Sequence, residues 1–176
     1  MKTNILIQTS DTKESDKIIE SFYDILESNY LLALSTIDLK NKQPHVCCVF
    51  YVFDKEFNLY IWTDPNSKHS NNIAKNSKVA VEIYDSHQKW GSLLKGLQIL
   101  GTSKQISNKE VLSIGPLYLK RYIKASNIIK TLKDFNSKKL ESQLYKIQIN
   151  NVKLLDENRF GKESYKEFDV KKIVKN

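Results

Sequence analysis

Residues 46–73 read VCCVFYVFDKEFNLYIWTDPNSKHSNNI, a segment that predicts two strands, a turn and the start of a helix. Val46–Phe53 and Phe57–Thr63 are rich in β-branched and aromatic residues, and the polar link Asp54–Glu56 joins them as in a β-hairpin. A Pro-Asn turn follows, and a helix is expected to start near Ser67. The segment therefore indicates an antiparallel sheet.

Periodicity on either side of this segment predicts more strands and several helices. Ile18, Phe22 and Ile25 recur at helical spacing near the N-terminus. Ser107, with Glu110 three residues later, matches a capping box and predicts a second helical region. We expect Gly115-Pro116 to interrupt that region. A further short helix is predicted at Ile128–Phe135, and strands at Tyr30–Asp38, Val79–Tyr84, Leu93–Ile106 and Leu144–Leu155.

The order of these elements favours an α+β fold. A helix, five strands, further helices and a closing strand indicate an antiparallel β-barrel of about six strands with flanking helices. The 176 residues fit a single domain, 1–176. Within it, residues 1–14 are an N-terminal lead-in and residues 164–176 a polar, lysine-rich tail.

Composition and charge argue against several classes of protein. The chain is 40% hydrophobic and 27% charged, which is typical of a globular domain. Its longest apolar run, Val46–Phe53, is too short to span a bilayer, and residues 1–12 lack a signal-peptide core. The net charge of +8 comes from residues 101–176, with 17 basic and 8 acidic side chains. Because only Arg121 and Arg159 are arginines, solvated lysine faces and a frayed tail explain this charge better than nucleic-acid binding.

Cys47 and Cys48 are the only two cysteines. Neighbouring residues on a strand point to opposite faces, so a disulfide between them would be strained. Two reduced thiols favour a cytoplasmic protein.

The turn after the second strand carries groups that suit a phosphate. Free N–H groups at a helix start attract anions, Thr63 and Ser67 offer hydroxyls, and Lys68 and a protonated His69 offer charge. The alternative is a well-capped turn with solvated polar side chains, because Ser, Asn and Asp favour such positions in any case.

These residues resemble the phosphate-binding turn of the pyridoxamine-5′-phosphate-oxidase-like FMN-binding split-barrel superfamily. The resemblance lies in Trp62-Thr63 at a strand end, in Ser67 and the basic pair Lys68-His69, and in the strand that opens at Val79. It extends to Cys47–Phe53 and Lys95–Gly101, and Asn158–Lys162 resembles a short bacterial branch of YhbP-like proteins. The similarity covers residues 15–163, which would form the split-barrel domain.

The resemblance implies FMN bound at a homodimer interface. Ser67, Lys68 and His69 would hold the phosphate, and Trp62 and Thr63 would line the ribityl chain. The strand at Cys47, Cys48 and Val49 would lie along the isoalloxazine ring.

Three departures bear on that assignment. His69 stands where the oxidase has lysine, Cys47 where it has arginine, and Gly96 where it has a ring-contacting glutamine. Gln98, two residues further on the same strand face, is a substitute for that glutamine. The C-terminal substrate-binding signature of the oxidase is absent from the sequence, so pyridoxamine-phosphate oxidation itself is not expected.

Other candidate sites are weaker. His45, His69 and His87 are too scattered for a metal-ligand pattern, and no catalytic residue can be nominated. Arg159 is expected to pair with a surface carboxylate or to reach a partner subunit's cofactor. The hypothesis is an FMN-binding oxidoreductase of unknown substrate. The alternatives are a non-catalytic flavin carrier or redox sensor, and a haem- or nucleic-acid-binding module.

Overall fold

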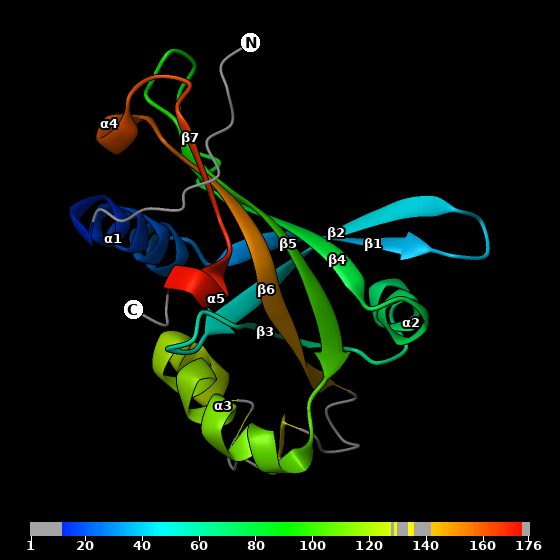
Figure 1. Cartoon of the computed structure of the whole chain (residues 1–176). Helices are drawn as coiled ribbons and strands as arrows, with labels where there is room; N and C mark the ends of the chain where they lie inside the picture. Colours follow the sequence, from blue (N-terminus) through cyan, green and yellow to red (C-terminus); the bar gives the residue numbers. More distant parts are fainter. Residues whose placement is uncertain (1–11, 128, 130–133, 136–141, 174–176) are drawn as a thin grey trace.

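Seven strands form one antiparallel sheet in the order β3-β2-β1-β4-β5-β6-β7 (Figure 1). The computed structural model describes residues 12–127, 129, 134–135 and 142–173. A further pairing of β3 with β6 closes six of the strands into a barrel, which confirms the α+β split-barrel prediction. The strands are β1 (Leu31–Asp38), β2 (Gln43–Phe53), β3 (Leu59–Thr63), β4 (Lys78–Tyr84), β5 (Lys95–Gln105), β6 (Gln143–Asp156) and β7 (Tyr165–Phe168).

The barrel interior is filled by alternate residues of each strand. In β1, Leu32 and Leu34 are buried, whereas Leu31 and Ile37 face outward and are exposed. This period of two places one apolar face against the core, where each fully buried aliphatic side chain contributes about 1.5–3 kcal/mol. The β4–β5 hairpin continues the pattern on both strands.

Two helices cover separate parts of the barrel. The helix α1 (Thr12–Ser28) places Phe22 and Leu26 in the barrel core. The helix α3 (Asn108–Arg121) packs Ile114 and Tyr118 into a second apolar cluster over β2 and β3. The remaining helices are α2 (Lys68–Lys75), α4 (Glu157–Phe160), α5 (Val170–Ile173) and the 3-10 helix η1 (Ile123–Asn127). No helix in the described part of the chain has the length and apolarity needed to cross a membrane.

Gly101 marks an irregularity between β5 and β6. The strand register shifts between Leu100 and Gly101, and a Cβ at position 101 would lie 2.5 Å from the carbonyl oxygen of Gln148. Only glycine allows the two backbones to approach this closely.

Two sequence predictions are wrong. The helix α3 continues through Gly115 and Pro116, although Pro116 cannot donate to the carbonyl of Leu112. Leu112 is exposed, so water can bond to that carbonyl, while burial of Ile114 and Tyr118 favours the unbroken helix. The capping box of Ser107 and Glu110 is confirmed.

The expected frayed tail is the second wrong prediction. Residues 165–168 form β7, which pairs with β6, and both Phe168 and Val170 are buried in the main core. The predicted helix at residues 128–135 falls mostly outside the described residues, as does most of the lead-in 1–14. Thr12 and the two residues after it already belong to α1.

Candidate functional site

The helix α2 begins where β3 ends, and Ser67 is its N-cap. The Ser67 hydroxyl accepts a hydrogen bond from the backbone N–H of Ser70, which satisfies one of the free donors of the first turn. Asp64 shapes the turn before it, because its carboxylate accepts from the N–H of Asn66. The N-terminus of α2, which is the positive end of its helix dipole, therefore lies at Lys68.

His69 lies in the first turn of α2 and is buried. Its Nε2 is 2.7 Å from Thr63 Oγ1 and 3.0 Å from Ser67 Oγ. Ser67 donates its own hydrogen to Ser70 Oγ, and Ser70 donates to the carbonyl of Asp64. Since the Ser67 hydrogen is used in this chain, the contact with Ser67 requires a hydrogen on His69 Nε2. The other ring nitrogen, Nδ1, is then the one with a lone pair when the ring is neutral.

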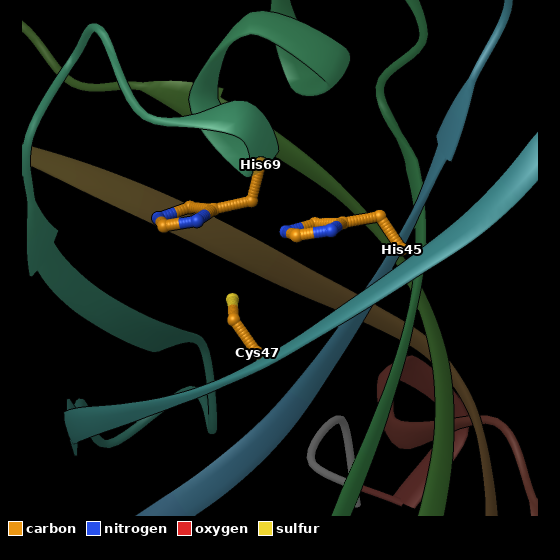
Figure 2. Close-up of side chains that lie close together, drawn as sticks. All are labelled: His45, Cys47 and His69. Atoms are coloured by element: carbon orange, nitrogen blue, oxygen red, sulfur yellow. The ribbon is translucent and has the colours of Figure 1, made fainter.

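His45 and Cys47 point from β2 toward His69 (Figure 2). The two imidazole rings are nearly parallel, with centroids 6.4 Å apart and an interplanar angle of 6°. One nitrogen of each ring and the Cys47 sulfur lie within 4.8 Å of one another. We call these three residues the His-Cys-His cluster.

Burial sets the protonation of this cluster. Desolvation is the main cause that lowers the pKa of His69, and the neighbouring His45 is the second, so the His69 ring is neutral near pH 7. Desolvation, followed by the adjacent Cys48, raises the pKa of the Cys47 thiol. His69 therefore does not supply the positive charge expected of it for a phosphate.

Lys68 supplies a positive charge at this place, but the negative charge of Asp38 lies beside it. Its ammonium group pairs with Asp38 at the end of β1, where the carboxylate is 12% exposed and the lysine side chain 52% exposed. Asp38 also accepts from the backbone N–H of Lys40 at 3.0 Å and from Asn41 at 3.1 Å. The hydrogen bond from Lys68 is the main reason why the pKa of Asp38 lies below its ordinary value.

The nine residues proposed from the sequence do not gather in one place. Thr63, Ser67 and His69 are joined by hydrogen bonds and Cys47 reaches the same spot, whereas Lys68 pairs with Asp38. Val49, on the same face of β2 as Cys47, packs against the main core. The other three lie elsewhere: Cys48 and Gln98 on the outer face of the sheet, and Trp62 in the second apolar cluster.

Trp62 is held by its own contacts. Its ring packs on Phe135 at 5.4 Å, and its Nε1 donates to the carbonyl of Phe135 at 3.1 Å. Because Trp62 and Thr63 are neighbours on a strand, they point to opposite faces, and only Thr63 faces His69. Arg159 pairs with the carboxylates of Glu20, Asp24 and Asp156. This agrees with the first of the two roles expected for it, a carboxylate partner.

The strand β2 has one free edge next to these residues. It pairs with β1 along residues 43–50, but with β3 only along residues 51–53. In the described part of the chain, no strand occupies the other edge of residues 43–50. The backbone donors and acceptors on that edge therefore have no strand partner within the described residues.

The outer face of the sheet carries a shallow hollow of about 530 Å³. Strand register aligns its side chains in rows, and one row runs across the sheet through Cys48, Ala33, Glu82, Gln98 and Lys153. The exposed apolar residues on this face include Leu31, Ile37, Val46, Phe50, Tyr84, Leu100 and Tyr165. Such a patch is typical of an interaction surface.

The expectation that His45 and His69 are too scattered to act together is wrong, because the two rings stack, and Asp38 is not predicted as a site residue at all. His45 lies 24 positions from His69, and Asp38 lies 30 positions from Lys68. The available signal for His45 is its spacing of two from Cys47, which places both side chains on the same face of a strand. For Asp38 the sequence holds no comparable signal.

Comparison with known proteins identifies the family. The chain matches the pyridoxamine 5'-phosphate oxidase family over residues 18–156. A comparison with curated protein sequences finds no match.

Solved structures share the fold at low identity. A putative pyridoxamine 5'-phosphate oxidase from Listeria innocua is 17% identical, with a TM-score of 0.58 over 81% of this chain and 98% of that one. The heme binding protein from Mycobacterium smegmatis is 12% identical, with a TM-score of 0.67 over 97% of this chain but only 62% of that longer one. The heme storage protein HutZ from Vibrio cholerae is 13% identical, with a TM-score of 0.57 over 74% of this chain and 89% of that one. With a family match that covers most of its length, this chain belongs to the pyridoxamine 5'-phosphate oxidase family.

Proposed function

We propose that the protein binds FMN and acts as a flavin-dependent oxidoreductase in the form of a homodimer. The observation that carries this proposal is the free edge of β2 beside the N-terminus of α2, where Lys68 is half exposed. An open backbone edge offers hydrogen bonds to a planar ring, and the helix start and Lys68 attract a phosphate. Family membership supports the same cofactor.

The residues near α2 fit a phosphate, though with weaker charge than an arginine pair would give. Lys68 is the first residue of the eight-residue helix α2, so its ammonium group and the remaining free amides of the first turn can act on the same anion. Asp38 opposes them, because its carboxylate competes with the phosphate for Lys68. His69 contributes position rather than charge, since it is buried and bonded to Thr63 and Ser67.

The backbone of Cys47, Cys48 and Val49 would hold the flavin ring along the free edge of β2. Bound FMN supplies hydride or electron transfer, and the protein residues orient the ring and exclude water from it. Gln98 lies on the outer face in the same row as Cys48 but three strands away from it, so we assign it to the partner's side of the site.

The exposed apolar face supports the homodimer. A second copy of the chain placed on this face would bury Leu31, Phe50 and Leu100 together, and self-complementary contact is the common form of dimerisation. We expect Leu100→Lys to shift the protein to monomers in sedimentation experiments. Leu112→Lys, at an exposed leucine on α3, is the matched control and should leave the dimer intact. A wild-type protein that sediments as a monomer, as Leu100→Lys is expected to, would contradict the dimer.

The free thiols of Cys47 and Cys48 support the cytoplasm as the location of this protein.

A comparison of FMN with riboflavin tests the site. Each flavin is titrated into the full chain, and binding is followed by quenching of flavin fluorescence. Because charge-assisted hydrogen bonds contribute about 1.5–3 kcal/mol, FMN should bind at least tenfold more tightly than riboflavin. Lys68→Met should remove most of that difference, whereas Lys75→Met, at the other end of α2, should not.

Equal binding of FMN and riboflavin would contradict the phosphate assignment. No binding of either flavin, together with a Soret band on titration with haem, would favour haem as the ligand. The Mycobacterium smegmatis protein is named as a heme binding protein, and the Vibrio cholerae protein as a heme storage protein. Turnover of bound reduced flavin with a nicotinamide donor or a small acceptor would separate an enzyme from a flavin carrier.

A further inference from the structure

We propose that His45, Cys47 and His69 bind one divalent transition-metal ion of the zinc class. This goes beyond flavin binding, since it assigns a second ligand to three side chains whose own chemistry the flavin proposal does not use. Two imidazoles and a thiolate are a donor set that zinc prefers. Magnesium and calcium take oxygen ligands and would not select it.

The backbone brings the three ligands together from two elements. His45 and Cys47 are alternate residues of β2, so both project from the same face of the strand. His69 projects from the first turn of α2, and its ring lies parallel to that of His45 (Figure 2). The three donor atoms lie within 4.8 Å of one another.

Only a small movement separates this arrangement from a coordination shell. Tetrahedral zinc with bonds of about 2.0–2.3 Å places neighbouring ligand atoms roughly 3.3–3.7 Å apart. The required closure is about 1 Å, which rotation of the half-buried side chains of His45 and Cys47 can supply because they lie at the free edge of β2. His69 is the buried, fixed member of the set.

Hydrogen bonds already hold His69 in the form that a metal needs. Its Nε2–H faces Thr63 Oγ1 at 2.7 Å and Ser67 Oγ at 3.0 Å. The Nδ1 lone pair is therefore directed away from these hydroxyls. A metal-bound histidine usually donates its other ring N–H to such a partner, which fixes both the tautomer and the ring orientation. Thr63 and Ser67 are positioning residues in this sense.

Three protein ligands leave one coordination position open. Sites of this kind hold a water molecule or a substrate atom in the fourth position, whereas structural zinc sites have four protein ligands. Binding converts the Cys47 thiol to a thiolate, and its proton is released to the buffer. We therefore expect an exchangeable ion rather than one that is needed for folding.

Cobalt(II) is the probe for this site, because cobalt accepts zinc ligands and is coloured. The full chain is treated with a chelator, freed of it, and titrated with Co²⁺ in the absence of flavin. We expect one equivalent of Co²⁺, a thiolate-to-cobalt charge-transfer band in the near ultraviolet, and loss of the band when Zn²⁺ is added.

Matched variants identify the ligands. Cys47→Ser should abolish the charge-transfer band, and His45→Gln should weaken Co²⁺ binding by at least about 100-fold, which exceeds the 10–100-fold effect of second-shell changes. Cys48→Ser and His87→Gln are the controls, since Cys48 faces the other side of β2 and His87 is an exposed histidine paired with Asp85. Both controls should bind Co²⁺ as the wild type does.

The proposal is overturned if the wild type gives no charge-transfer band, or if the band survives in Cys47→Ser. Equal loss of binding in Cys48→Ser would also overturn it. His45 is half buried at a strand edge, so His45→Gln should keep the fold, which circular dichroism verifies. FMN retention is measured separately, so flavin binding without cobalt binding contradicts only the metal site, and the reverse contradicts only the flavin site.

Discussion

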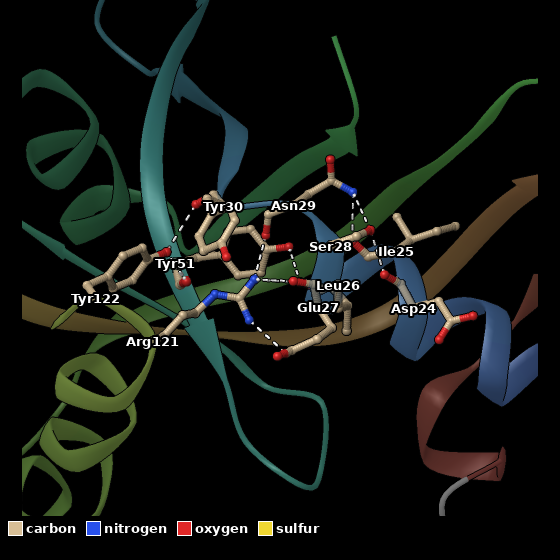
Figure 3. A network of polar contacts seen from close by, with 10 residues as sticks. All are labelled: Asp24, Ile25, Leu26, Glu27, Ser28, Asn29, Tyr30, Tyr51, Arg121 and Tyr122. Atoms are coloured by element: carbon tan, nitrogen blue, oxygen red, sulfur yellow. Dashed lines mark hydrogen bonds and ion pairs between the residues drawn. The ribbon is translucent and has the colours of Figure 1, made fainter. Parts of the chain in front are cut away.

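Two polar clusters of this protein differ in what surrounds their charged and polar groups. Arg121, at the end of α3, is 10% exposed and donates to Glu27 and to the carbonyls of Leu26 and Asn29 (Figure 3). Its guanidinium carbon also lies 5.1–5.5 Å from the centres of three aromatic rings, those of Tyr30, Tyr51 and Phe53. This cluster ties α3 to the last turn of α1.

The cluster at α2 is arranged differently. The hydroxyls around His69 fix one edge of its ring, and its other edge faces His45 and Cys47. Lys68 is half exposed and shares a single carboxylate, that of Asp38. A cation that is surrounded by carbonyls and aromatic rings stabilises the fold. We propose that the side chains of His45, Cys47, Lys68 and His69, which lie beside the unpaired edge of β2, serve ligand binding instead. The two regions should therefore respond differently to substitution.

The largest effect on stability is expected at Arg121. Arg121→Met removes the donor to the carbonyls of Glu27 and Asn29, while the carbonyl of Leu26 keeps only the Tyr51 hydroxyl. The change should lower the free energy of unfolding by about 3 kcal/mol. Urea denaturation followed by circular dichroism measures this change. Lys120→Met, at the exposed neighbour, should change stability by less than about 0.5 kcal/mol. Similar values for the two variants would break the contrast, as would a loss of FMN affinity in folded Arg121→Met.

Ser67→Ala should have a smaller effect on the α2 side. Loss of the N-cap hydroxyl should lower stability by about 1 kcal/mol. Cobalt affinity should also fall, because His69 loses one of its two hydroxyl partners. Asn66→Ala changes an exposed side chain of the same turn and should alter neither quantity. Unchanged stability in Ser67→Ala would show that the cap is not formed in solution.

Asp38→Asn tests whether Lys68 is a phosphate ligand that an acidic neighbour restrains. Removal of the carboxylate charge frees Lys68 and should raise FMN affinity by roughly threefold, which corresponds to about 0.6 kcal/mol for a half-exposed ion pair. Riboflavin affinity should not change, because riboflavin has no phosphate. Fluorescence titration measures both affinities. Weaker FMN binding in this variant would contradict the assigned role of Lys68.

A last, small difference concerns pH and the two helix starts. A hydrogen bond from the backbone N–H of Ser107 is the main cause that holds the pKa of Glu110 below its ordinary value, and a hydrogen bond from the Ser107 hydroxyl is the second. The corresponding position of α2 is Ser70, which has no carboxylate. The ionised Glu110 therefore adds stability that is fully present above its ordinary pKa and is lost as pH falls through its lowered pKa.

Glu110→Gln keeps the capping geometry but does not titrate. Between pH 7 and pH 3, the variant should lose slightly less unfolding free energy than the wild type. The measurement is urea denaturation at both pH values. An equal loss in both proteins would mean that Glu110 does not contribute to the acid sensitivity.

The fold was largely predictable because its signals are local. The helical spacing of Ile18, Phe22 and Ile25, the capping box at Ser107 and the alternation in the strands each lie within a few residues. The wrong predictions depend on tertiary contacts. Packing of Tyr118 keeps α3 intact across Pro116, and the pairing with β6 gives the polar C-terminal segment a strand.

The site was predictable only in part, for the same reason. Thr63, Ser67 and His69 lie within seven residues, and the sequence groups them correctly in space. The contacts of His69 with His45 and of Lys68 with Asp38 depend on how β1 and β2 lie against α2, which no local pattern contains. The alternation of a strand separates Cys48 from Cys47, so a run of adjacent residues in the sequence becomes two faces in the fold.

The most direct test of the account is the visible absorption spectrum of the purified full chain after incubation with FMN and gel filtration. Flavin bands that elute with the protein, at one FMN per chain, are the predicted result. A protein that elutes colourless and leaves all FMN in the small-molecule fractions would contradict the proposed function.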